Sequence, residues 1–279
     1  MAKVWKLIAS LCVLAGLTSV APAHADGPIT YTLEPWDGDG VIATFTLTQL
    51  NHGGSLCPCV KIPYPATGFP KDIQKGADNI AKVSLKPGDT VLGFSLGQRV
   101  VSLYLAQHTP PPEVKFLLDG ATLESNQKLV DEGTGVPWDI PAPVTMVANE
   151  YDGWSDFPDN AASPGYNLAE QNANAGKRHV HNYVNAQLHN PANVVTTRGN
   201  ITAILIPTQK LPLNDGLRLR GLNAEADRLD AEQRAQIDDA YSRPKPSPEQ
   251  LAAATDEQVG VPPAPIYQSP EPVAVLDGG

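Results

Sequence analysis

Short apolar segments alternate with segments of helical periodicity through most of the chain, and this alternation limits the fold more than any other feature. The strand-like segments cover residues 60–64, 90–94, 114–118, 144–148 and 201–206, with a further alternating candidate at 41–48. The segments with helical spacing of apolar residues cover 73–83, 98–107, 162–175 and 180–188. Strands that alternate with helices indicate an α/β fold with a mostly parallel central sheet and helices on both faces.

The first 25 residues have the pattern of a signal peptide. Lys3 and Lys6 precede an apolar run over residues 7–20, and Ala23-His24-Ala25 is a typical cleavage site. The run of about 14 residues is shorter than the roughly 20 that span a bilayer, so we expect no transmembrane anchor. The sequence therefore predicts a chain that is secreted or held at the cell envelope, with its main domain over residues 26–241.

The composition changes after Tyr241. Eight prolines follow in a stretch with few large apolar residues, at positions 244, 246, 248, 262, 263, 265, 270 and 272. Such a stretch cannot bury enough apolar surface to offset the entropy of ordering it. We interpret residues 242–279 as a Pro-rich disordered tail.

Charge and cysteine content exclude several classes of partner. The chain has 20 basic and 30 acidic residues, a formal net charge of −10, whereas nucleic-acid binding requires clustered Lys and Arg. Cys12 would leave with the signal peptide, and Cys57 and Cys59 offer at most half of a metal site. A local disulfide, a link to another molecule and two free thiols all fit that spacing. We expect no nucleic-acid partner, no metal and no cofactor.

The motif Gly93-Phe94-Ser95-Leu96-Gly97 carries the clearest chemistry. A predicted strand runs directly into it and a predicted helix runs directly out, which is the context that the nucleophile elbow of α/β-hydrolases requires. Ser95 is thus the candidate nucleophile. The backbone N–H of Leu96, at the start of the helix, is the candidate oxyanion-hole donor.

A serine nucleophile needs a base that is oriented by an acid, and in α/β-hydrolases the acid and then the histidine follow the serine in the chain. Asp152 comes directly after the predicted strand 144–148, and Asp156 is the alternative acid. His179 and His181 follow the acid, and spacing alone does not separate them. A metal site built on the two histidines would need a third ligand, and the sequence has no recognised zinc spacing.

Several stretches in order resemble the PE-PPE domain, a cutinase-related α/β-hydrolase domain of mycobacteria. They are Val60 to Ala66, Gly93 to Gly97, Tyr151 to Pro158, the segment from Asn167 to Tyr183, and Leu211 to Arg218. In this family a histidine lies two residues before a tyrosine, so the resemblance implies His181 as the base. Both family aspartates are present, and we keep Asp152 as the acid, giving Ser95, Asp152 and His181.

The resemblance implies a secreted serine esterase or lipase that cleaves lipid or acyl esters through an acyl-enzyme. It equally allows an acyltransferase that moves fatty acyl groups onto cell-envelope glycolipids, because both reactions use one triad. A non-catalytic module that binds the cell wall is a further alternative, since a fold alone does not establish activity. Residue types leave the acyl chain, the alcohol and the second oxyanion donor undetermined.

Overall fold

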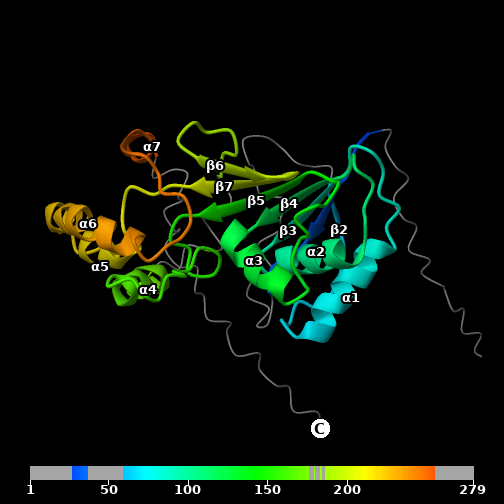
Figure 1. The fold of residues 1–279 in the computed structure, drawn as a ribbon, viewed down its shortest axis with the longest axis horizontal. Coiled ribbons are helices and arrows are strands. Elements are labelled where there is room, and N and C mark those ends of the chain that lie inside the picture. Colours follow the sequence, from blue (N-terminus) through cyan, green and yellow to red (C-terminus); the bar gives the residue numbers. More distant parts are fainter. Residues whose placement is uncertain (1–26, 37–58, 176–178, 180–182, 184–185, 255–279) are drawn as a thin grey trace, which may run out of the picture.

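A computed structural model describes residues 27–36, 59–175, 179, 183 and 186–254 of the chain. The predicted signal peptide and the strand candidate at 41–48 lie outside these residues. The described part contains one seven-stranded sheet in the order β2-β1-β3-β4-β5-β7-β6 (Figure 1). Its strands are β1 (Thr30–Leu33), β2 (Cys59–Lys61), β3 (Thr90–Phe94), β4 (Lys115–Asp119), β5 (Val144–Asn149), β6 (Val194–Arg198) and β7 (Ile201–Ile206).

Every neighbouring pair of strands is parallel except β6 and β7, which form an antiparallel hairpin. The central strands are buried on both faces because they consist of nearly continuous apolar residues. The predicted fold class, an α/β fold with a mostly parallel central sheet, is therefore confirmed.

The helices form two groups in space (Figure 1). The first group, α1, α2 and α3, lies along one side of the sheet, and the second, α4, α5 and α6, lies beyond the carboxyl ends of the strands. The helices are α1 (Pro70–Ala81), α2 (Leu96–Gln107), α3 (Leu123–Asp131), α4 (Tyr166–Ala175), α5 (Asp215–Arg218), α6 (Asn223–Asp238) and α7 (Pro248–Ala253). In the part of the chain that is described, no helix combines the length and the apolar composition needed to cross a bilayer.

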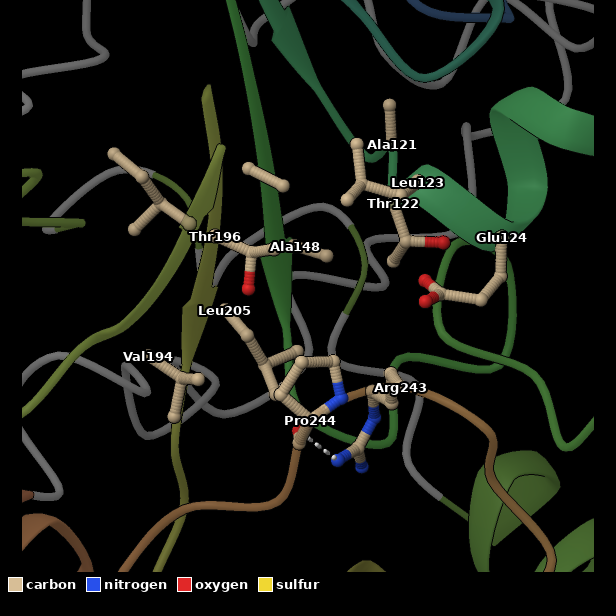
Figure 2. A pocket seen from close by; sticks show the side chains of 12 residues that line it. Ala121, Thr122, Leu123, Glu124, Ala148, Val194, Thr196, Leu205, Arg243 and Pro244 are labelled. Atoms are coloured by element: carbon tan, nitrogen blue, oxygen red, sulfur yellow. Dashed lines mark hydrogen bonds between the residues drawn. The ribbon is translucent and has the colours of Figure 1, made fainter. Parts of the chain in front are cut away.

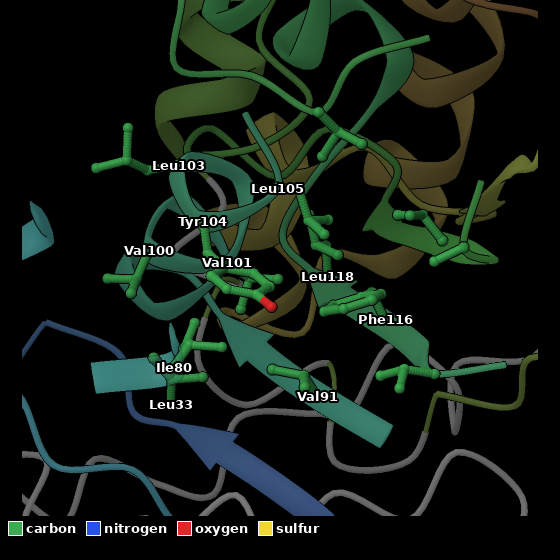
Figure 3. Close-up of a cluster of buried hydrophobic side chains, with 14 of the residues drawn as sticks. Leu33, Ile80, Val91, Val100, Val101, Leu103, Tyr104, Leu105, Phe116 and Leu118 are labelled. Carbon is green, nitrogen blue, oxygen red and sulfur yellow. The ribbon is translucent and has the colours of Figure 1, made fainter. Parts of the chain in front are cut away.

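The main core lies between the sheet and the first helix group. Figure 3 shows Ile80 of α1 and Val100, Val101 and Tyr104 of α2 gathered over strand residues such as Val91. A second apolar cluster on the other face joins strand residues to Tyr183 and Ala186. A third cluster of Tyr151, Ala169, Leu211, Ile237, Ala240 and Tyr241 attaches the second helix group to the carboxyl edge of the sheet.

Most periodic segments form the predicted element, and two differences stand out. β1, β6, α3, α5 and α6 occur where no element was expected. The predicted helix over 180–188 is absent at Tyr183 and at 186–188, the described residues of that segment. Cys59 in β2 is disulfide-bonded, and Cys12 and Cys57 lie outside the described residues.

The structure also differs from the expected tail at residues 242–254. Arg243 is only 5% exposed, and Ser247 and Gln250 form a capping box that starts α7. These residues pack against the domain because Arg243 finds buried carboxylates to pair with. Residues 255–279 lie outside the described residues.

The turn from β3 to α2 depends on close backbone contact. A Cβ on Gly97 would lie 2.1 Å from the carbonyl oxygen of Leu33 in β1, and a Cβ on Gly93 would lie 2.5 Å from the carbonyl oxygen of Gly97. Real Cβ atoms do not approach backbone so closely, and the backbone cannot move aside without shifting the sheet. The two glycines therefore let α2 start directly against the edge of the sheet.

We expect Gly97→Ala to lower the free energy of unfolding by about 1–3 kcal/mol, because the added methyl overpacks β1. Gly216→Ala in α5 is the matched control, since nothing lies within 4 Å of its added Cβ. That control should be neutral or stabilising by up to about 1 kcal/mol. Urea denaturation measures both, and equal effects of the two substitutions would contradict the role assigned to Gly97.

Candidate active site

Ser95 occupies the turn between β3 and α2 in a strained conformation. Its φ of 53° and ψ of −115° place it in a region that residues with side chains rarely adopt. Its backbone N–H donates to the carbonyl oxygen of Asp119 at 2.9 Å, and its own carbonyl accepts from Gln98 N–H at 3.1 Å. These bonds hold a half-buried serine at the carboxyl edge of the sheet. Strain that is held by its surroundings is typical of functional turns.

Leu96 is the first residue of α2. The first N–H groups of a helix have no acceptor within that helix, and the helix dipole adds partial positive charge at this end. The Leu96 N–H therefore lies beside Ser95 where an oxyanion could accept from it. Gly38 and the pair Gly53-Gly54, which could supply a second donor, lie outside the described residues.

Asp152 is fully buried in the loop that follows β5. Its Oδ2 lies 2.6 Å from His179 Nδ1 and accepts from the Ser155 hydroxyl at 2.7 Å and the Tyr183 hydroxyl at 2.9 Å. Its Oδ1 accepts from Trp154 N–H at 3.1 Å. Burial by itself raises the pKa of Asp152, but the contact with His179 and these hydrogen bonds outweigh it, so the pKa lies below its ordinary value of 3.8.

His179 lies between the acid and the serine turn. Its ring stacks on Phe94, with 5.3 Å between the ring centroids, and Phe94 directly precedes Ser95. A Cβ built on Gly120 would lie 3.1 Å from His179 Cε1 and 3.7 Å from Ser95 Cα. Gly120 has a φ of 88°, a backbone conformation that glycine adopts most easily. A side chain at this position would also crowd the His179 ring.

The ring nitrogens of His179 have different surroundings. Because the carboxylate of Asp152 is ionised, it favours the tautomer in which Nδ1 carries the hydrogen. Nε2 is buried and has no hydrogen-bond partner among the described residues. This tautomer leaves Nε2 as an unprotonated acceptor, which is the form that a general base requires.

The structure separates the two candidate aspartates. Among the described residues, the carboxylate of Asp156 pairs with Arg243 and not with His179. It accepts from Arg243 Nε at 2.7 and 2.9 Å and from Tyr151 N–H at 2.8 Å. His181, the base that the resemblance implies, lies outside the described residues.

Sequence reasoning missed the hydroxyls of Ser155 and Tyr183. Ser155 lies three residues after Asp152, a spacing that suits a local hydrogen bond, whereas no local pattern indicates the role of Tyr183.

A pocket of 280 Å³ opens beside the candidate site. Gly120 connects it to Ser95 and His179, and Trp154, whose side chain is mostly exposed, stands at its border 6.2 Å from the His179 ring. The other lining residues are mostly charged or polar and come from α2, α3, the loop after β5 and the segment after α6: Gln98, Arg99, Thr122, Glu124, Ser125, Lys128, Leu129, Glu132, Ser155, Asp156, Phe157, Asp159, Tyr241 and Arg243.

The family model described as the PE-PPE domain matches residues 60–242. The chain is also similar to a protein of Mycobacterium tuberculosis (strain ATCC 25618 / H37Rv) named diacyltrehalose acyltransferase Chp2, with 37% identity over 105 residues. The aligned part covers 35% of this chain and 28% of that relative, so it spans less than a third of the relative's length.

The hydrogen bond from Ser155 to Asp152 should stabilise the fold in a pH-dependent way. The pKa of Asp152 is lowered on folding, so its stabilisation is fully present above its ordinary pKa and is lost as the pH falls through the lower value of the folded state. We expect Ser155→Ala to cost about 1.5–3 kcal/mol near neutral pH. That cost should shrink only below the ordinary carboxyl pKa, as the pH falls toward the lower pKa that Asp152 has in the folded state.

Ser102→Ala is the control for this experiment. The Ser102 hydroxyl is equally buried but donates to the neutral amide oxygen of Gln98 at 3.4 Å. Its cost should not depend on pH in the same range. Chemical denaturation between about pH 2 and pH 7, a range that extends below the ordinary carboxyl pKa, measures both variants. A Ser155→Ala cost that stays constant over this range would contradict the account.

Proposed function

Because the chain belongs to the PE-PPE domain family, we propose that it is an acyl-ester enzyme in which Ser95, His179 and Asp152 form the catalytic triad. The observation that carries this proposal is the 2.6 Å contact between Asp152 Oδ2 and His179 Nδ1, directly beside the strained turn at Ser95. His181 is the base in the family pattern. We choose His179 because its Nδ1 faces the buried carboxylate and its Nε2 has no other partner among the described residues.

The first half of the reaction forms an acyl-enzyme. Ser95 Oγ attacks the carbonyl carbon of the ester while His179 Nε2 takes the hydroxyl proton. The Leu96 N–H donates to the oxyanion that develops on the carbonyl oxygen. The C–O bond to the alcohol then breaks, and His179 Nε2–H returns its proton to the leaving oxygen. Asp152 stays ionised throughout and stabilises the imidazolium.

The second half releases the acyl group. A hydroxyl compound enters, loses its proton to His179 Nε2, and attacks the carbonyl carbon of the acyl-enzyme. Ser95 Oγ leaves and regains its proton from the same nitrogen. If the hydroxyl compound is water, the result is ester hydrolysis; if it is an alcohol group of a sugar, the result is acyl transfer.

Two features favour acyl transfer as the second candidate. The relative from Mycobacterium tuberculosis is named as a diacyltrehalose acyltransferase. The pocket beside Gly120 combines the exposed indole of Trp154 with charged side chains, a combination that suits a polyol better than an acyl chain, because a chain would leave those charges without water or partners.

Export of the chain is part of the proposal. The signal-peptide pattern over residues 1–25 supports it. The disulfide at Cys59 fits an oxidising compartment, since disulfides are rare in the reducing cytosol. We propose that the chain acts outside the cytoplasmic membrane or at the cell envelope, on acyl esters of lipids.

Labelling with a fluorophosphonate tests the triad. We expect Ser95→Ala to abolish labelling of the otherwise reactive protein, and His179→Gln and Asp152→Asn to slow it by at least about 100-fold. His181→Gln and His189→Gln, the second at an exposed residue, should stay within about threefold of the wild-type rate.

The outcomes of this labelling differ in what they exclude. Lost labelling in His181→Gln together with retained labelling in His179→Gln would move the base to His181. A folded wild-type protein that takes up no probe would instead favour the non-catalytic module that binds the cell wall.

A second experiment tests the acceptor side. With a short acyl ester as donor and trehalose as acceptor, Trp154→Ala should lower kcat/KM for transfer about tenfold, the equivalent of about 1.4 kcal/mol of lost stacking. Hydrolysis of the donor should change by less than about twofold. Phe69→Ala, an exposed aromatic that does not line the pocket, is the control. An equal loss in both reactions would contradict the proposal that Trp154 contributes selectively to acceptor binding.

A further inference from the structure

The loop that carries Asp152 begins with a residue in the left-handed region. Tyr151 has a φ of 62°, and its side chain is fully buried. Such a conformation is unfavourable for an aromatic residue and persists only where the surroundings enforce it. The Tyr151 N–H donates to Asp156 Oδ2 at 2.8 Å. The direction in which the chain enters Asp152 therefore depends on where the Asp156 carboxylate is held.

Arg243 holds that carboxylate from 87 residues further along the chain. Its Nε lies 2.7 Å from Asp156 Oδ1 and 2.9 Å from Oδ2, and its Nη2 lies 3.4 Å from Glu150 Oε1. Its guanidinium also lies over the ring of Tyr241, 4.5 Å from the centroid. Both partners of the main ion pair are nearly inaccessible, with 4% and 5% exposure, so little water screens their attraction.

The position of this arginine in the chain is unexpected. It lies just past the range that the family model matches, which ends at residue 242. Figure 2 shows Arg243 and Pro244 lying across from Ala121, Thr122 and Glu124, near Leu205 and Ala148, around a small pocket of 30 Å³. Arg243 Nη1 donates to the carbonyl oxygen of Pro244 at 3.4 Å. The arginine side chain is therefore also bonded to the backbone of the next residue.

We propose that Arg243 is a positioning residue of the candidate site. By pairing with Asp156 it fixes the left-handed backbone at Tyr151, and this directs the Asp152 carboxylate toward His179. The inference rests on the proposed role of Asp152 and His179. It also assigns a function to Asp156: it holds the loop rather than serving as the triad acid.

Arg234 provides a matched comparison, because it reaches the same buried carboxylate of Glu150 as Arg243 does. It reaches Glu150 Oε2 at 3.4 Å, the Tyr151 hydroxyl at 2.9 Å and the carbonyl of Thr208 at 2.7 Å. It therefore contacts the side chain of Tyr151 and not the carboxylate that holds the backbone N–H of that residue. Removing Arg234 takes one cation away from Glu150 without releasing Asp156, which Arg243 still holds.

The test compares Arg243→Met, Arg243→Lys and Arg234→Met with the wild-type full chain. Hydrolysis of a p-nitrophenyl ester gives kcat and KM. The far-downfield proton resonance of the His179 Nδ1–H reports the contact with Asp152 without any need for turnover. Circular dichroism and thermal unfolding identify the variants that fold.

We expect Arg243→Met to lower kcat by about 10- to 100-fold with KM within about twofold, because a misplaced triad acid slows the chemical step more than it weakens binding. The downfield resonance should be shifted or lost. Arg243→Lys, which keeps the charge, should recover part of kcat, and Arg234→Met should stay within about threefold of wild type.

A folded Arg243→Met with the kcat and the resonance of Arg234→Met would overturn the inference. If Arg243→Met fails to fold, Arg243→Lys decides: a lowered kcat with a shifted resonance supports the inference, and wild-type values overturn it. If the wild-type protein turns over no ester, the proposed function fails, and the resonance by itself still decides whether Arg243 orients the pair of Asp152 and His179.

Discussion

Backbone contact between helix α2 and the edge of the sheet underlies the whole arrangement around Ser95. Gly97 touches the carbonyl of Leu33 and Gly93 touches Gly97 so closely that no side chain fits. This contact makes the turn sharp enough to leave Ser95 at the end of its strand in the left-handed region. The same contact brings the first N–H groups of α2 to Ser95, so the position of the serine and that of these donors have a common structural cause.

The acid side of the site depends on buried charge instead of close packing. Asp152 lies in a dry interior and stays ionised because His179, two hydroxyls and a backbone N–H all point to it. Its loop is fixed in turn by Asp156 and Arg243. The second helix group completes this support, since residues of α4 and α6 pack with Tyr151 in one apolar cluster. Much of the carboxyl-terminal part of the chain thus holds one loop in place.

Local periodicity was enough to predict β3, α2 and β5, because each of these segments is strongly apolar and bounded by turn residues. It therefore also predicted that Ser95 and Asp152 follow the ends of strands. β1 is only four residues long, which is too short for a clear period-two pattern, so it gives little signal. Which histidine meets Asp152 depends on contacts across the fold that no spacing encodes. Arg243 was missed for a related reason: it directly precedes a segment rich in proline, and only a distant carboxylate shows that it is buried.

Mass spectrometry of the acyl-enzyme tests the central claim most directly. The purified protein is mixed with a p-nitrophenyl acyl ester, quenched with acid during turnover, and digested. The account predicts a mass increase of one acyl group on the peptide that contains Ser95, and none in Ser95→Ala. Release of p-nitrophenolate with no adduct, or with the acyl group on another residue, would contradict the assignment of Ser95 as the nucleophile.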